Sequence, residues 1–383
     1  MAHIERRDTR GGETRYDVRW RVGRTERSKS FKLFRSAEAF KRRVESAELV
    51  GLVTNPKAGD ERLEPYAVRW VETRLVRGRP LAPATRYGYE SLLRRDVRPY
   101  ALAQLPLRQI DPEAVRTWHG EVIAASGVQQ AAKAYRVVRA VLNTAVDDEL
   151  IYRNPCRIKG AGTEHWGERP MPSTGDVLDL IEAMTPRYRV VCALAGLGGL
   201  RTGEILGLRH CDIDPLHGEV HVVQEAQEIP GLGRIVKGPK SEAGVRTVVL
   251  PTPVMALLVE HMASYPASPT GELVTDPAGG PARRARISDA WRAAKRAAGA
   301  DAALHLHDLR HHAATVTARM PGITTKELMA RLGHASPRAA LIYQHATEER
   351  DRAIAAYLDE QLAIAERQKR APIMHFGRLS GNR

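Results

Sequence analysis

Four short segments in the second half of the chain carry side chains suited to phosphoryl transfer. They are GLRTGEILGL at 199–208, LHDLRHHAAT at 306–315, RLGHASP at 331–337 and IYQHA at 342–346. Their reactive side chains are Arg201, His307, Arg310, His334 and Tyr343. Two arginines to hold a phosphate, two histidines and a hydroxyl nucleophile make a set that needs no metal.

A tyrosine that attacks a phosphodiester must first lose its proton, and its reference pKa is about 10. At pH 7 about one tyrosine in a thousand is ionised, a shortfall worth roughly 4 kcal/mol. A neighbouring base and cations around the phosphate can offset that shortfall, while the departing 5′ oxygen needs a proton donor. Arginine suits the cationic role because its planar fork donates two hydrogen bonds at once.

The same segments allow plainer interpretations. Any one of these residues alone is more often a surface or packing residue, and only their order and spacing together favour a site. His307 and His311 are four residues apart, with His305 and His312 nearby, which is also a zinc-binding spacing. We expect no metal, because Arg310 lies between the two and no Glu or Cys follows at ligand spacing.

Composition points to a polyanionic partner. The 383 residues carry 59 Lys+Arg against 45 Asp+Glu, a formal charge of +14. That charge also fits ribosomal, heparin-binding or membrane-surface proteins, so the motifs must decide. Phe and Trp are too sparse for a base-stacking platform, and no apolar run approaches the roughly 20 residues of a membrane span. We expect a cytoplasmic protein with buried free thiols, since its three cysteines lack CxxC spacing.

Three segments should position these side chains. In residues 1–55, apolar and charged residues alternate from Tyr16 to Phe34, which predicts an antiparallel hairpin, and Ser36 precedes a helical pattern. Arg19 and Arg21 on this sheet are candidate DNA contacts. A linker around Asn55–Pro65 follows.

Residues 62–160 show helical spacing and predict a domain of four or five helices. Asp111 followed by Pro112 is a strong helix start. The basic residues of these helices are candidate DNA contacts, although an ordinary solvated face is the plainer interpretation of any single one. The candidates are Arg86, Arg94, Lys133 and Arg136.

Residues 171–368 predict a larger α/β unit, followed by a weakly ordered tail at 369–383. Helical patterns at 174–184 and 188–200 precede a strand pair at 219–229 and 246–251, after which helices return. The last helix, Glu349–Gln368, is amphipathic, and its apolar face could dock on a neighbouring subunit or pack within its own domain. That face comprises Ile354, Ala355, Leu358, Leu362 and Ala365.

Four features of the sequence resemble the signature of tyrosine recombinases, the phage integrase family. They are GLRTGEILGLR, HDLRH, LGH and a tyrosine nine residues after the histidine of LGH. The match spans about Met171 to Leu362, and PKS at 239–241 resembles the lysine hairpin of the family. Residues 62–160 resemble its helical core-binding domain, and 1–55 the arm-binding domain of integrases. The resemblance implies a multidomain, mainly α protein with an α+β catalytic domain.

The resemblance also implies roles. Tyr343 attacks the scissile phosphate to form a 3′-phosphotyrosine, Arg201 and Arg310 hold the non-bridging oxygens, and His334 adds a hydrogen bond to the phosphate. Because the phosphotyrosine conserves the bond energy, a second 5′ hydroxyl can reseal the strand without a cofactor.

Three further residues receive roles in the same way. Lys240 protonates the leaving oxygen, although Lys237, three residues earlier, is an alternative acid. His307 assists proton transfer at the tyrosine. Glu204 orients the site from a position three residues after Arg201.

The expected protein is a site-specific DNA recombinase that integrates and excises a mobile element in the bacterial cytoplasm or nucleoid. Its expected partners are double-stranded attachment sites, three further copies in a homotetramer on synapsed DNA, and an excision factor or host DNA-bending protein. The alternatives are a chromosome-dimer or plasmid resolvase of the same family, and a non-catalytic DNA-binding regulator that retains the fold.

Overall fold

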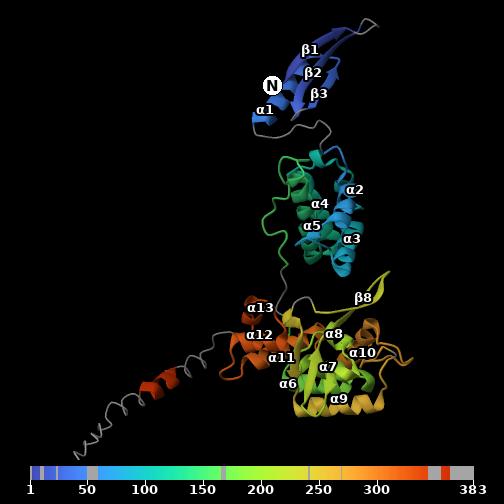
Figure 1. Ribbon diagram of the computed structural model, residues 1–383, viewed down its shortest axis with the longest axis vertical. Helices are drawn as coiled ribbons and strands as arrows, with labels where there is room; N and C mark the ends of the chain where they lie inside the picture. Colours follow the sequence, from blue (N-terminus) through green and yellow to red (C-terminus); the bar gives the residue numbers. More distant parts are fainter. Residues whose placement is uncertain are drawn as a thin grey trace, which may run out of the picture. The chain divides into compact units, whose positions relative to one another are not determined.

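The computed structural model describes residues 2–8, 13–22, 25–49, 59–164, 170–239, 242–268, 270–343 and 355–362. The chain divides into two compact units, Met1–Glu168 and Arg169–Arg383 (Figure 1). Within the described ranges, none of the helices combines the length and the apolar character that crossing a bilayer requires.

The first unit begins with a three-stranded antiparallel sheet and one helix. The strands are β1 (His3–Asp8), β2 (Thr14–Val22) and β3 (Thr25–Phe31), in the order β1-β2-β3, and the helix is α1 (Phe34–Leu49). The side chains of Val18 and Trp20 lie on the same face of β2 and are buried. The centroid of the Trp20 ring lies 5.3 Å from that of Phe40 in α1. The sheet and helix therefore have a small core of their own.

The structure corrects two details of this segment. Strand β1 was not expected, because HIERRD is almost entirely charged and exposed and shows no apolar alternation; it pairs with β2 through its backbone. Helix α1 begins at Phe34 and not after Ser36, and the Phe34 ring lies 5.4 Å from that of Tyr16.

Between residues 59 and 164, four α-helices pack around a separate core. They are α2 (Leu63–Thr73), α3 (Pro83–Asp96), α4 (Pro112–Ser126) and α5 (Val128–Asp147), with a short hairpin of β4 (Leu75–Val76) and β5 (Arg79–Pro80) between α2 and α3. The helix start at Asp111 is confirmed: its side chain accepts a hydrogen bond from the Ala114 amide at 2.8 Å, with Pro112 as the first helical residue.

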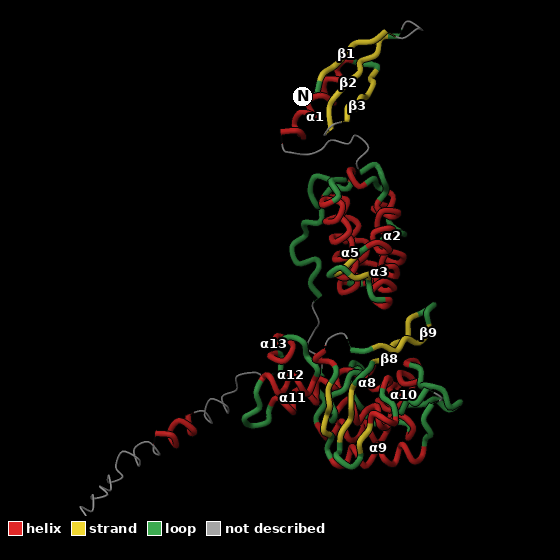
Figure 2. The backbone as a smooth tube through the Cα atoms, in the orientation of Figure 1, coloured by secondary structure: helices red, strands yellow, loops and turns green. Residues whose placement is uncertain are grey.

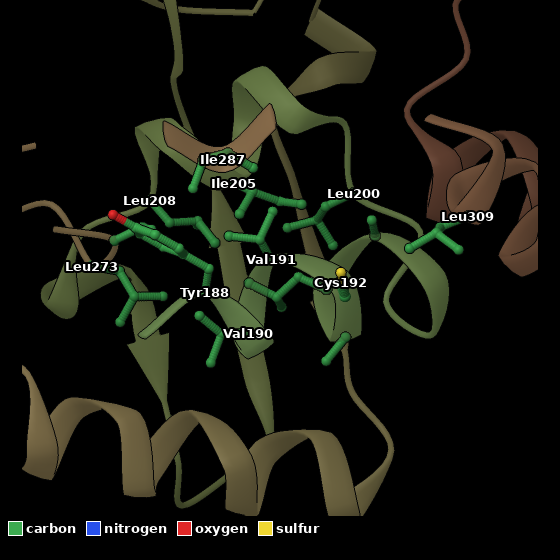
Figure 3. Packing of buried hydrophobic residues seen from close by; sticks show 14 of the residues in the cluster. Tyr188, Val190, Val191, Cys192, Leu200, Ile205, Leu208, Leu273, Ile287 and Leu309 are labelled. Atoms are coloured by element: carbon green, nitrogen blue, oxygen red, sulfur yellow. The ribbon is translucent and has the colours of Figure 1, made fainter. Parts of the chain in front are cut away.

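Helix α7 (Arg189–Gly196) is the centre of the second unit. Every residue from Val190 to Gly196 is buried, and the helix packs against α6 (Thr174–Ala183), α8 (Thr202–Gly207), α9 (Thr252–Ser264) and α11 (Leu306–Ala318). Further α-helices of this unit are α10 (Arg284–Ala297), α12 (Thr325–Leu332) and α13 (Pro337–Leu341). Figure 3 shows Val191 and Cys192 of α7 among Leu200, Ile205 and Leu309.

Two small sheets complete the second unit. β6 (Ile213–Asp214), β7 (Glu219–Val222) and β10 (Arg246–Val249) form an antiparallel sheet in the order β10-β7-β6. β8 (Glu225–Ile229) and β9 (Gly233–Lys237) form a separate hairpin (Figure 2). The prediction of a single strand over 219–229 is therefore wrong. The chain leaves the first sheet after Val222, and Glu225–Ile229 pairs with β9. Strand β9 was not predicted, because the glycines around it indicated a loop.

The expected C-terminal helix lies mostly outside the described residues. The described part, 355–362, is helical, and Leu358 and Leu362 in it are exposed. Ile354 and Ala365 of its expected apolar face, and the tail at 369–383, lie beyond the described ranges.

Candidate active site

Arg201 and Glu204 lie at the start of α8. Gly199, with φ of 73°, turns the chain after α7, and Leu200 is buried beneath the turn. Glu204 Oε2 accepts a hydrogen bond from the Arg201 backbone amide at 2.8 Å, and Glu204 Oε1 accepts one from Arg201 Nη1 at 2.6 Å. Glu204 thus caps the helix and holds the Arg201 guanidinium at the same time.

Arg310 on α11 is only 3% exposed and meets the same region from another side. Its guanidinium donates to the carbonyl oxygens of Gly199 and Leu332. Arg201 Nη2 donates to the next carbonyl, that of Gly333, at 2.9 Å. The backbone of two consecutive residues therefore joins two arginines that are 109 positions apart in the sequence.

His334 and Tyr343 lie directly beside these carbonyls. Helix α12 ends at Gly333 in the left-handed conformation, with φ of 62°, and His334 follows. Helix α13 then brings Tyr343 back, because the buried Ala340 joins α13 to α12. The rings of His334 and Tyr343 are nearly parallel, at 18°, with centroids 6.3 Å apart.

Arg246 on β10 completes the charge network, a role that the sequence did not predict. It is 6% exposed at its side chain and binds both oxygens of Glu204, at 3.0 and 2.9 Å. Its Nε also donates to the carbonyl of Arg331 at 2.9 Å. The position of an arginine shortly after the lysine segment was visible in the sequence, but its contact with Glu204, 42 residues away, was not.

The tyrosine is hydrogen-bonded to a different histidine than expected. His311 Nδ1 lies 2.5 Å from Tyr343 Oη, and the rings are 5.7 Å apart. His307, one turn earlier on α11, has its ring edge-on to that of His311 at 5.0 Å. Among the described contacts of Tyr343, none reaches His307.

Charge and burial set the protonation of the site. Burial would raise the pKa of Glu204, but the hydrogen bonds and charge of Arg246, helped by Arg201, lower it to about 2. Burial, with nearby positive charge, lowers the pKa of both His307 and His334 to about 4, so both are neutral at pH 7. Burial also raises the pKa of Tyr343, which makes a base necessary for its attack.

The predicted lysine lies outside the described residues. Lys240 and its neighbour Ser241 fall in the gap between 239 and 242. Lys237, the alternative acid, is the last residue of β9 and forms an ion pair with Glu225 at 3.3 Å.

The histidines considered for zinc have different partners. His312 Nδ1 is hydrogen-bonded to the carbonyl of Pro172 at 2.9 Å, and His305 lies 3.5 Å from Asp308. The described residues contain no group of three or more His, Cys, Asp or Glu side chains placed to hold a metal ion.

The candidate DNA contacts of the first unit are surface groups, several with acidic partners. Arg19 pairs with Glu5 at 2.9 Å and Arg86 with Glu90 at 2.7 Å. Lys133 and Arg136 both reach Glu164, while Arg21 and Arg94 are exposed. Exposed ion pairs contribute little stability, roughly 0–1 kcal/mol, so phosphates could compete for these cations.

Comparison with known proteins identifies the family. The phage integrase family model matches residues 174–350. The "Putative prophage phiRv2 integrase" of Mycobacterium tuberculosis (strain ATCC 25618 / H37Rv) is 38% identical over 308 residues, covering 79% of this chain and 79% of the relative.

Solved structures agree on the fold. The Tn1549 transposon integrase in complex with a circular intermediate DNA matches with a TM-score of 0.66 at 19% identity, over 78% of this chain and 99% of that one. A lambda integrase tetramer bound to a Holliday junction matches with a TM-score of 0.55 at 17% identity, over 87% of this chain and 96% of that one. These likenesses confirm the multidomain, mainly α fold. With the family match and the identity to the prophage integrase, they establish that the chain belongs to the phage integrase family, as a tyrosine recombinase of a mobile element that cleaves and rejoins DNA.

Proposed function

We propose that the protein integrates and excises its mobile element at specific sites, through a covalent 3′-phosphotyrosine intermediate. Tyr343 Oη attacks the scissile phosphorus and displaces the 5′ oxygen of the next nucleotide. Arg201 and Arg310 hold the non-bridging oxygens, His334 donates a further hydrogen bond, and Lys240 protonates the leaving oxygen.

One observation carries this proposal. The guanidiniums of Arg201 and Arg310 are fixed on the carbonyls of residues 332 and 333, immediately before His334, whose ring faces that of Tyr343. Cations that are held in place before the substrate binds need no reorganisation when negative charge develops on the phosphate. Such preorganised electrostatic stabilisation of the transition state is usually the largest single contribution to an enzyme's rate enhancement. Glu204 keeps Arg201 oriented without meeting the phosphate.

The remaining assignments follow from the family. Residues 62–160 act as the core-binding domain and 1–55 as the arm-binding domain, with 171–368 as the catalytic domain. The lambda integrase tetramer on a Holliday junction supports a tetramer on synapsed DNA as the working assembly. An excision factor or a host DNA-bending protein would set the direction of the reaction.

Covalent trapping tests the nucleophile. The probe is a nicked duplex that carries the junction sequence of the element encoding this chain, so that cleavage releases a short strand and cannot be reversed. Wild-type protein should form a covalent adduct that survives denaturing electrophoresis, and Tyr343→Phe should bind the same duplex but form none. Tyr357→Phe is the matched control, because Tyr357 is an exposed tyrosine nearby in the sequence. An adduct with Tyr343→Phe would refute the proposal.

A further inference from the structure

The candidate nucleophile has a histidine partner to which the sequence analysis gave no role. His311 Nδ1 is within hydrogen-bond distance of Tyr343 Oη, and both residues are partly buried. A base must lie about 2.6–3.2 Å from the proton-bearing atom, directly or through one water, to accept its proton. In the described structure His311 is the histidine that meets this condition at the tyrosine oxygen.

His307 lies one turn earlier on α11, and its ring contacts that of His311 instead. Its ring is perpendicular to that of His311, at 82°. The charges and titratable groups around the pair are His307 and Arg310 on α11, His334 after α12 and Arg201 before α8. The neutral form of His311 is the one able to accept a proton.

We propose that His311 is the general base that accepts the phenolic proton of Tyr343 during DNA cleavage; this rests on Tyr343 being the nucleophile of the proposed function. As the Tyr343 Oη–P bond forms and the P–O5′ bond breaks, the phenolic proton moves to His311 Nδ1, and the O5′ leaving group takes a proton from the general acid. During rejoining, the incoming 5′ hydroxyl gives its proton to the deprotonated general acid as it attacks phosphorus, and protonated His311 returns the phenolic proton to the departing tyrosine oxygen.

His307 then acts on the tyrosine through His311. Its neutral ring packs against that of His311 and limits the orientations that the acceptor can adopt. This makes His307 a positioning residue, whereas His311 touches the reacting atom. The two roles predict different kinetic behaviour for two histidines four residues apart on one helix.

The test compares His311→Gln with His307→Gln in the full-length protein, under single-turnover conditions with the nicked duplex. His311→Gln should bind DNA normally but cleave about 10²–10⁴-fold more slowly at pH 7, the usual contribution of a general base. This loss should shrink as the pH rises, since hydroxide then removes the phenolic proton. His307→Gln should lose less and keep the wild-type pH profile. His311→Asn provides a second, smaller replacement, and a thermal melt of each variant reports its folding.

A substrate with sulfur in place of the bridging 5′ oxygen separates base from acid. A thiolate leaves without protonation, so a defect in the general acid should be rescued, whereas the His311→Gln defect should persist. The inference is overturned if the phosphorothiolate restores His311→Gln, if His307→Gln alone changes the pH profile, or if a folded His311→Gln cleaves at the wild-type rate. Those outcomes leave the Tyr343→Phe result untouched, so the inference can fail while the nucleophile assignment stands.

Discussion

Glu204 is a single carboxylate on which the arginines of the site converge. It accepts hydrogen bonds from Arg201 and Arg246, and Arg310 lies 3.8 Å away. A buried charge that loses its partner is costly, because the partner left behind remains desolvated. Glu204 therefore stabilises the fold as well as the orientation of Arg201.

Glu204→Gln should lower the free energy of unfolding by about 3–5 kcal/mol, as for other broken buried ion pairs. It should also slow covalent trapping. The pKa of Glu204 in the folded protein is about 2, below its usual 4.5. Its stabilisation is therefore complete above pH 4.5 and is lost as the pH falls from 4.5 toward 2. Urea unfolding at several pH values should show a weaker acid dependence in the variant over that window.

Asp212→Asn is the matched control for this prediction. Asp212 is also buried and accepts hydrogen bonds from an arginine, Arg209, three residues earlier, but none of its described contacts reaches Arg201 or Arg310. The control should lose stability and retain cleavage per folded molecule. Equal loss of cleavage in both variants would show that Glu204 acts only through stability.

At the scale of elements, the junction between α12 and His334 is the most constrained turn of the site. Gly333 has φ of 62°, and a Cβ there would lie 2.7 Å from Arg246 Nη1. The same turn presents the Gly333 carbonyl to Arg201. A side chain at this position would displace Arg246 and disturb Glu204 in turn.

Gly333→Ala should therefore cost about 1–2 kcal/mol of stability from the left-handed backbone and also reduce the rate of covalent trapping. Gly322→Ala separates the two effects, because Gly322 has φ of 78° but open space where its Cβ would be. Both variants should melt at lower temperature, and only Gly333→Ala should trap DNA more slowly. Similar trapping by the two would argue against the coupling through Arg246.

The elements also show where prediction from sequence works. The helix starting after Asp111 was predictable because its signal is local, within a few residues, and the motifs that carry the candidate site residues are equally local. The β8–β9 hairpin was missed because no Gly or Pro between Val222 and Glu225 marks the point where the chain leaves the first sheet. The contacts of His311 and Arg246 were missed for another reason: they join residues 32 and 42 positions apart in the sequence. His307 and His311 lie on one helical face, and only the folded chain decides which one meets Tyr343.

At the scale of the whole molecule, each segment has its own hydrophobic core. The core of the N-terminal sheet consists of residues between Ala2 and Val44, and neither the four-helix core nor that of the second unit includes any of them. Removal of the sheet therefore deletes no residue of the other two cores. This independence allows the sheet to be tested by deletion.

Deletion of residues 1–55 should impair integration and leave cleavage of the core site near the wild-type rate. For an arm-type duplex, the dependence of log affinity on log salt should also become shallower, by about 0.9 for every phosphate that Arg19, Arg21 and their neighbours neutralise in the intact protein. Recombination assays and binding titrations at several salt concentrations measure both effects. Full integration by the truncated protein would contradict the arm-binding assignment. Arg21→Gln in the intact chain is the control that checks whether the change in salt dependence reflects charge.

Because Arg201 and Arg310 are anchored to main-chain oxygens of residues 199, 332 and 333, the identity of most neighbouring side chains matters less than the path of the chain. Two of those three anchors are glycines with positive φ. Side chains around this pocket that do not contact Glu204 or its arginines can thus vary, provided that both turns survive. An inserted or deleted residue at either turn would misdirect a guanidinium, and a substitution elsewhere would not restore its orientation.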